Sequence, residues 1–372
     1  MLLTGVTGYL GGHLLAALLD QTDLRVHCLV RAATEAEAAE RLREVLHEHG
    51  LARHAGRVVP VPGNLERSML GLSEADFDRL ATQVEAIYHC GAAVHFTLPY
   101  TALRDSNVLG TQEVLRLAVR GRLKPVHHVS TTAVFAADRA GEIGERSAEH
   151  SPEALPTGYA QSKWAAERLV EAARERGIPV TVYRPGAVTG DTRTAASRPD
   201  DAVWRMLKGC LQLGLAPDIG TGIVGAPADF VCRALVHLAR DPRTQGGTFH
   251  LIAERATSWR EVFATARDLG YRVRTVDYAD WLATLDDLRE EDGNALFPLV
   301  HQFSRTGDAT PAVFDRRATS QALSGSGIEC PPLDAALLTR YIRHFIDTGF
   351  LPSPEGGTRE FANSVQIGGT NA

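Results

Sequence analysis

Three regularly spaced glycines near the start of the chain restrict its fold more than any other feature of the sequence. Gly5, Gly8 and Gly11 follow an apolar run at residues 1–4 and precede leucines that recur at helical spacing. A strand, a glycine-rich turn and a helix in this order are typical of the first βαβ unit of a dinucleotide-binding fold. Glycine lets the backbone turn tightly and approach a pyrophosphate, and the helix N-terminus that follows favours phosphate charge.

Strands and helices alternate through the first half of the chain. We predict strands at residues 1–4, 25–31, 58–62, 86–89, 126–130 and 180–184, and residues 249–252 are a candidate for a late strand that returns to the same sheet. Thr34 and Glu37 form a capping box that opens the helix running toward His49. Repeated βα units imply a parallel sheet with right-handed crossovers and helices on both faces. The adjacent His127 and His128 are expected to point one to the core and one to the surface.

This alternation ends near residue 190. Residues 1–190, with about 224–254, are predicted to form a Rossmann-type doubly wound α/β domain. Residues 191–223 and 255–352 are predicted to form a smaller, mainly helical C-terminal substrate-binding lobe, in which Trp204 and the leucines after it either line an acyl channel or form core. Residues 353–372, rich in Gly, Thr, Ser and Asn, are expected to be a flexible tail. Because the chain begins inside its first strand, we expect it to be a domain of a longer polypeptide.

Composition narrows the classes of partner and compartment. The net charge of −6 argues against nucleic acid as the main partner. No apolar run approaches the length of a membrane span, and no secretion signal opens the chain. The five cysteines are widely spaced without a C-x-x-C pair, and the histidines show no H-E-x-x-H spacing. We therefore expect a cytoplasmic protein without a metal, a membrane partner or a nucleic-acid partner.

The end of the second strand indicates the type of cofactor. An NAD-preferring fold places a carboxylate there for the ribose 2′-hydroxyl, but this strand ends in Arg31 and has no carboxylate until Glu35. A guanidinium binds a 2′-phosphate, and Arg41 in the next helix offers a second contact, so NADPH is the predicted cofactor. The alternative is that Arg31 is a surface charge at a strand end. Further cofactor contacts are expected after the third and fourth strands, at Asn64, Leu65, Gly91, Ala92 and Ala93.

Two elements point to proton-transfer chemistry. Tyr159 and Lys163 lie four residues apart on a predicted helix and so share one face. A nearby ammonium lowers the pKa of a tyrosine and makes it a usable acid near neutral pH. The residues 130–132, Ser-Thr-Thr, end the fifth strand, where a hydroxyl can donate to a carbonyl oxygen as charge develops. The spacing does not show which of the three hydroxyls is the donor. The alternative is that all three only cap the end of the strand.

Several longer segments resemble a known family. They are LLTGVTGYLGGHLL, CLVRA, YHCGAAVHF, NVLGTQEVLRLA, HHVSTTAVF, GYAQSKWAAERLV and VYRPGAVTGD. The chain resembles the extended short-chain dehydrogenase/reductases and, more narrowly, the terminal thioester reductase domains of nonribosomal peptide and polyketide synthetases and the related carboxylic acid reductases. The resemblance runs from residue 1 to about residue 352.

The resemblance implies a role for each matching residue. Thr131 would be the hydroxyl donor, Tyr159 the proton donor, and Lys163 the partner of Tyr159 on the nicotinamide ribose. The residues implied to contact the remainder of the cofactor are Thr4, Gly5, Thr7, Gly8, Tyr9, Leu10, Gly11, Arg31, Arg41, Asn107, Pro185, Gly186 and Val188. Asn64 stands where many relatives have aspartate, a departure that would alter the adenine contact but leaves the essential parts of the resemblance intact.

The implied activity is reductive release of a thioester. NADPH would reduce an acyl or peptidyl chain held on the phosphopantetheine arm of a carrier protein to an aldehyde, or in a second round to the alcohol, within a larger synthetase. The helical segment at residues 34–56 is a candidate docking surface for the carrier. The alternatives are another extended short-chain reductase, such as a fatty acyl-CoA reductase or a nucleotide-sugar epimerase or dehydratase, and a redox-silent NADP-sensing module. The intact Tyr159 and Lys163 argue against the last.

Overall fold

The computed structural model describes residues 1–95, 97–135, 141–145, 151–303 and 313–354. The chain divides into two compact units. The first comprises Met1–Val188, Ala228–Ile252 and Ala312–Cys330, and the second comprises Thr189–Pro227, Ala253–Pro311 and Pro331–Ala372. Nearly all of the predicted tail, residues 353–372, lies outside the described residues.

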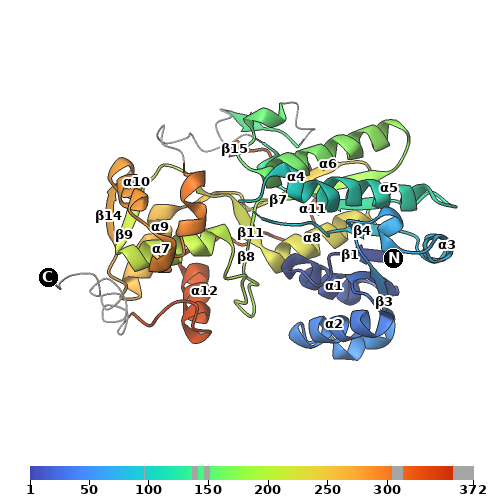
Figure 1. Cartoon of the computed structure of the whole chain (residues 1–372), viewed down its shortest axis with the longest axis horizontal. Coiled ribbons are helices and arrows are strands. Elements are labelled where there is room, and N and C mark those ends of the chain that lie inside the picture. Colours follow the sequence, from blue (N-terminus) through green and yellow to red (C-terminus); the bar gives the residue numbers. More distant parts are fainter. Residues whose placement is uncertain (96, 136–140, 146–150, 304–312, 355–372) are drawn as a thin grey trace. The chain divides into compact units, whose positions relative to one another are not determined.

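A seven-stranded parallel sheet forms the centre of the first unit (Figure 1). The strand order is β12-β7-β5-β4-β1-β2-β3, and β1 pairs in parallel with both of its neighbours, β2 and β4. The prediction of a doubly wound α/β fold is therefore confirmed, and the late strand does return to the sheet. The strands are β1 (Leu2–Thr4), β2 (Val26–Arg31), β3 (Val58–Gly63), β4 (Ile87–His89), β5 (Val126–Val129), β7 (Val180–Pro185) and β12 (Thr248–Leu251).

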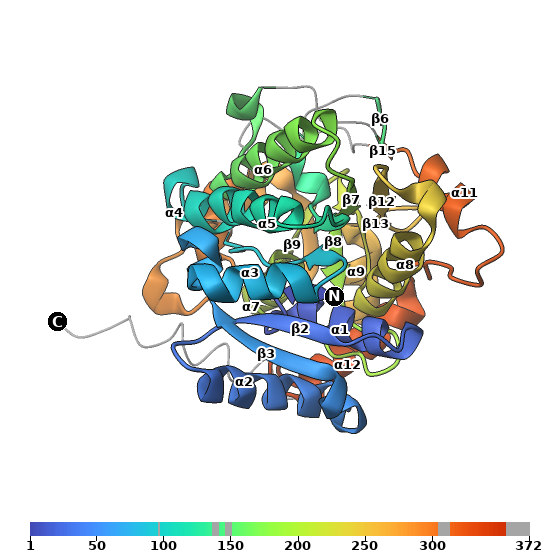
Figure 2. The same cartoon turned by 90° about the vertical axis from the view of Figure 1, so that its right-hand side faces the viewer.

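Helices cover both faces of this sheet (Figure 2). Helix α1 (Tyr9–Gln21) packs against α8 (Ala228–Arg240), and α2 (Glu35–Glu48) packs on β2 and β3. On the other face, α3 (Glu74–Gln83), α5 (Gly110–Val119) and α6 (Gly158–Glu175) enclose an apolar core with Leu2, Phe77 and Val170 among its members. Thr34 caps α2 by accepting a hydrogen bond from the Glu37 amide, which confirms one half of the predicted capping box. The Glu37 carboxylate accepts from the Ala33 amide at 2.9 Å rather than from that of Thr34.

The expectation for the paired histidines of β5 is wrong. Both His127 and His128 are buried. A strand in the middle of a parallel sheet has helices over both of its faces, so alternate residues both meet core instead of core and solvent. The His127 ring hydrogen-bonds through Nδ1 with the Tyr183 hydroxyl at 3.1 Å, and burial lowers the pKa of His127 to about 4.

The second unit is mainly helical with short strand pairs. Trp204 packs edge-on against Tyr341 and Phe345, so it is core rather than the wall of an open channel. The elements of this unit are α7 (Ala202–Leu213), β9 (Leu215–Asp218), β10 (Gly222–Ile223), β11 (Gly225–Pro227), β13 (Thr257–Ser258), α9 (Trp259–Asp268), β14 (Arg274–Asp277), α10 (Tyr278–Asp286), η7 (Glu290–Asp292), η8 (Phe297–Gln302) and α12 (Ala335–Asp347). Strand β8 (Ala187–Thr189) begins in the first unit and ends with the first residue of the second. Among the described helices of the whole chain, none has the length and hydrophobicity to span a membrane.

One segment falls in a different unit from the one that the sequence predicted. Residues 312–330, expected in the substrate lobe, belong to the first unit. Strand β15 (Val313–Phe314) pairs with β6 (Glu142–Ile143), and α11 (Arg317–Leu323) packs on α8 and β12. The remaining elements of the first unit are η1 (Ala52–Arg57), η2 (Ser68–Gly71), α4 (Tyr100–Arg104), the π-helical turn η3 (Asp105–Leu109), η4 (Thr132–Val134), η5 (Pro152–Ala154) and η6 (Pro242–Thr244).

A buried carboxylate fastens this segment. Glu145 accepts hydrogen bonds from the backbone amides of His250 at 3.0 Å, Ala318 at 2.7 Å and Thr319 at 3.2 Å, and from the Thr319 hydroxyl. These donors belong to β12 and α11, so a single side chain joins three stretches that are distant in the sequence. No periodic pattern in a sequence reports such a contact.

We predict that Glu145→Ala lowers the free energy of unfolding by about 3 kcal/mol, because it leaves several buried amide groups without acceptors. Urea denaturation followed by circular dichroism measures the loss. Glu142→Ala is the matched control, since Glu142 pairs with Arg317 on the exposed surface of the same segment and should leave stability almost unchanged. Equal denaturation midpoints for the two variants would contradict the proposed fastening role.

Candidate active site

The predicted site residues gather at the carboxyl ends of the parallel strands. Thr4 ends β1, Arg31 ends β2 and Pro185 ends β7, while Gly91 and Thr131 follow β4 and β5. Because all seven strands run in the same direction, these ends lie along one edge of the sheet.

The glycine loop is packed so closely that side chains would not fit. Gly5 has a positive φ of 78°, and a Cβ atom there would lie 2.6 Å from Gly91 Cα. A Cβ atom on Gly11 would lie 1.9 Å from the Gly5 carbonyl oxygen. Thr7 and Gly8 at the tip are exposed, so the loop presents backbone to its surroundings. This is the cradle that a pyrophosphate requires.

Thr4 and Asn107, both expected to bind cofactor, have their side chains engaged within the protein. The Thr4 hydroxyl accepts from the Gly91 amide at 3.0 Å and hydrogen-bonds with His89 Nδ1 at 2.8 Å. Asn107, in the π-helical turn, accepts from the Ala93 amide at 2.7 Å and donates to the Ala93 carbonyl at 3.0 Å and to Ser162 Oγ at 2.9 Å. These side chains hold the loops and α6 in place, which is a positioning function.

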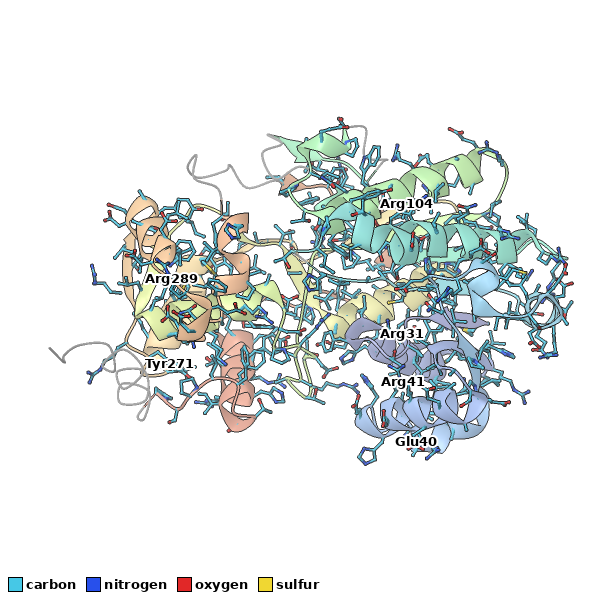
Figure 3. All side chains as sticks on the ribbon, in the orientation of Figure 1. Arg31, Glu40, Arg41, Arg104, Tyr271 and Arg289 are labelled. Atoms are coloured by element: carbon cyan, nitrogen blue, oxygen red, sulfur yellow. The ribbon has the colours of Figure 1, made fainter. Side chains whose placement is uncertain are left out.

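Arg31 and Arg41 lie together at the end of β2 (Figure 3). The Arg31 side chain is exposed, and Arg41 donates a hydrogen bond from its guanidinium to the Arg31 carbonyl. Helix α2 therefore places a second positive charge beside the first. Asn64, after β3, uses its side-chain oxygen to accept from the Glu66 amide at 2.9 Å, which shapes the neighbouring turn.

The structure narrows the choice among the three hydroxyls that follow β5. The Ser130 hydroxyl donates a hydrogen bond to the buried Glu167 carboxylate, so its proton is already used within the protein. Thr131 accepts from the Ala133 amide at 3.1 Å, an interaction that uses a lone pair and leaves the hydroxyl proton to be donated elsewhere. The geometry thus favours Thr131 over Ser130 as the donor, in agreement with the role implied by the resemblance.

Lys163 links β5 to α6, which carries Tyr159 and Lys163 and is referred to as the catalytic helix because both are predicted catalytic residues. Tyr159 and Lys163 occupy successive turns of α6, whose N-terminus is capped by Thr157. The Lys163 ammonium is buried and donates to the Val129 carbonyl at 2.8 Å, two residues before Thr131. Burial is the largest influence on Lys163 and lowers its pKa to about 8, while the charges of Glu167 and Cys90 act in the opposite direction.

Sequence reasoning missed Ser162, Glu167 and Arg184, whose buried side chains hydrogen-bond to elements that carry the predicted site residues. Ser162 accepts from Asn107 and donates to the Tyr159 carbonyl at 2.8 Å, so it connects the π-helical turn to the catalytic helix. Glu167 lies four residues after Lys163 and Arg184 directly precedes Pro185. Their positions offered a weak signal, but only the folded chain shows which partners they have.

Comparison with known proteins gives matches over almost the whole chain. The family model described as male sterility protein, NAD_binding_4, matches residues 3–235. A linear gramicidin synthase protein of Brevibacillus parabrevis is 40% identical over 94% of this chain, and the L-2-aminoadipate reductase large subunit of Penicillium chrysogenum is 34% identical over 95% of it. The chain spans only 7% and 27% of these two proteins.

Solved structures of similar fold cover almost the whole of this chain. The terminal R domain from the myxalamid PKS-NRPS biosynthetic pathway is 42% identical, with a TM-score of 0.90 over 95% of this chain and 92% of that one. The reductase (R) domain of a nonribosomal peptide synthetase from Mycobacterium tuberculosis is 26% identical, with a TM-score of 0.77 over 94% and 92%. The chain belongs to the NAD_binding_4 family and, within it, to the terminal reductase domains of peptide and polyketide synthetases.

Proposed function

We propose that this domain is an NADPH-dependent thioester reductase that releases an acyl or peptidyl chain as an aldehyde or, after a second reduction, as an alcohol. The observation that carries the proposal is the anchoring of Lys163 to the Val129 carbonyl, at the sheet edge that also bears Thr131 and the glycine loop. That arrangement provides a hydroxyl donor, a proton donor and a cation at one edge of the sheet.

The residues present fit NADPH. The glycine loop is a backbone cradle that a Cβ atom would fill, and two guanidinium groups lie at the end of β2 where NAD-preferring folds have a carboxylate. Gly5, Gly8 and Gly11 would hold the pyrophosphate, Arg31 and Arg41 the 2′-phosphate, and Pro185, Gly186 and Val188 would border the nicotinamide. When bound, NADPH supplies the hydride.

Side chains of this domain would stabilise the negative charge that develops on the carbonyl oxygen and would supply the proton to it. Thr131 donates a hydrogen bond to the thioester carbonyl oxygen, where negative charge develops. Tyr159 donates its phenolic proton to the same oxygen, and the Lys163 ammonium stabilises the tyrosinate that remains. Loss of the thiol from the resulting hemithioacetal gives the aldehyde. Lys163 must be protonated for this role, so activity is expected to fall as the pH rises through its pKa of about 8.

We assign the substrate to a carrier protein that bears it on a phosphopantetheine arm. A relative of known structure is a thiolation-reductase di-domain from an archaeal nonribosomal peptide synthetase, and another relative is a synthase protein many times longer than this chain. A tether between carrier and reductase raises the effective concentration, so a weak carrier contact would suffice.

The function is tested by incubating the domain with acyl thioesters on a carrier protein and NADPH, and by identifying the product by mass spectrometry. We expect aldehyde or alcohol from the wild type. Tyr159→Phe should reduce turnover by at least about a hundredfold, because it removes the proton donor, and should leave NADPH affinity unchanged. Tight NADPH binding without turnover on any carrier-linked acyl chain would favour the sensing module instead.

Arg31→Ala is expected to weaken NADPH binding by about tenfold or more, since it removes a charge-assisted contact to the 2′-phosphate, and to change NADH binding by less than about threefold. Fluorescence titration with each cofactor measures both affinities. Arg25→Ala is the matched control, because Arg25 is also exposed but precedes the opposite, amino end of the same strand. Equal losses for the two cofactors would remove the 2′-phosphate assignment.

Gly11→Ala is expected to abolish cofactor binding, because the added Cβ would overlap the Gly5 carbonyl and displace the loop. Gly56→Ala is the control, since a Cβ atom at Gly56 meets nothing within 4 Å. Calorimetric titration with NADPH compares the two variants after circular dichroism has established that both are folded. Normal binding by folded Gly11→Ala would show that the loop is not the cofactor cradle.

A further inference from the structure

A buried ion pair joins α6, the helix of Tyr159 and Lys163, to β7. Arg184 donates from Nε to Glu167 Oε1 at 2.9 Å and from Nη2 to Oε2 at 2.5 Å, so the two side chains meet in a bidentate pair. Their exposed fractions are 1% and 2%. Two charges this deeply buried are costly unless their remaining hydrogen-bonding capacity is used, so their other contacts are informative.

Each member of the pair touches an element that carries a predicted site residue. Glu167 lies on α6, one turn after Lys163, and accepts the hydroxyl proton of Ser130, which is the residue before Thr131. Arg184 lies on β7, directly before Pro185. The ion pair therefore fastens the ends of β5 and β7 to the catalytic helix.

Arg184 also contacts two aromatic side chains. Its guanidinium lies over the Phe135 ring, 4.8 Å from the ring centre. The His250 ring approaches Arg184 Nη1 through Nε2 at 3.4 Å, while Nδ1 donates to the Asp315 carbonyl at 2.8 Å. Burial, followed by the charge of Arg184, lowers the pKa of His250 to about 4, so this ring is neutral and accepts rather than repels.

Glu167 also provides the negative charge that faces Lys163. Burial opposes ionisation of Glu167, but the charge and hydrogen bonds of Arg184, the Ser130 hydroxyl and the charge of Lys163 outweigh it and hold its pKa below the ordinary value. Without this carboxylate, Lys163 and Arg184 would be two buried cations on adjoining elements. A buried lysine in that situation loses its proton more readily.

We propose that Glu167 is a positioning residue of the reductase: held by Arg184 and Ser130, it keeps Lys163 charged and fixes the ends of β5 and β7 against the catalytic helix. Glu167 is 2% exposed, and we infer that it acts through Lys163 and Ser130. The catalytic part of this inference rests on the proposed function. The effect of Glu167 on the protonation of Lys163 does not depend on that function.

That protonation can be measured without turnover, because the chain contains only three lysines, Lys124, Lys163 and Lys208. Protein labelled with ¹³C and ¹⁵N at lysine gives three side-chain signals that can be followed by NMR as a function of pH. We expect the midpoint of Lys163 near 8 in the wild type. In Glu167→Gln, which keeps the shape and loses the charge, the midpoint should fall by about one unit or more. Lys124 and Lys208 serve as internal references and should not move.

Turnover should follow the same shift. The wild type is expected to lose activity as the pH rises through the Lys163 midpoint, and Glu167→Gln should lose it at correspondingly lower pH. A carboxylate that only stabilised the fold would lower kcat equally at every pH. Arg174→Met is the matched control, because Arg174 fastens the far end of α6 to the carbonyls of Val180 and Gly247. It should lower the melting temperature and leave the Lys163 midpoint in place.

A double variant separates the effect of the ion pair on protein stability from the effect of Glu167 on Lys163. Glu167→Leu with Arg184→Met replaces the pair by apolar side chains, which should recover stability relative to either single change. The charge of Glu167 that favours the ammonium is still missing, so we expect the Lys163 midpoint to stay below its wild-type value and turnover to remain poor. Recovery of turnover together with stability, or an unchanged Lys163 midpoint in folded Glu167→Gln, would overturn the proposal. If the wild type reduces no thioester, the proposed function fails, and the NMR midpoint still decides the role of Glu167.

Discussion

The single direction of all seven strands in the central sheet determines where this domain can carry out chemistry. A parallel sheet needs helices over both faces, so its interior positions become core and its carboxyl edge remains as the place where loops gather. The glycine loop after β1, the arginine at the end of β2, the hydroxyl after β5 and the turn after β7 meet there. Residues separated by more than a hundred positions become neighbours for this reason alone.

Burial on both faces also governs the polar side chains. A polar group removed from water must find a partner, and here those partners connect the functional loops to each other. Asn107 uses its amide oxygen and nitrogen on Ala93 and Ser162, and Glu167 uses its carboxylate on Ser130 and Arg184. The predicted site is therefore supported by a set of buried hydrogen bonds and by the buried ion pair of Glu167 and Arg184.

The differences between the sequence prediction and the structure have a common origin. Residues 312–330 joined the first unit because Glu145 and strand β6 bind them, although their sequence shows no Rossmann periodicity. Nothing in the sequence indicated that the side chains of Thr4 and Asn107 hold loops in place through hydrogen bonds with Gly91 and Ala93. In each case the deciding contact is long-range, and a pattern of spacing records only short-range neighbours.

Residue order alone predicts the seven strands, the glycine turn, the shared face of Tyr159 and Lys163, and the arginine at the end of the second strand. These features depend on periodicity and backbone conformation, which are local properties that a chain carries in its residue order. Only the folded chain shows that Ser130 donates a hydrogen bond to Glu167, that Glu167 and Arg184 form a buried ion pair, and that both histidines of β5 are buried. These outcomes depend on which elements pack together, because burial and pairing exist only once distant segments have met.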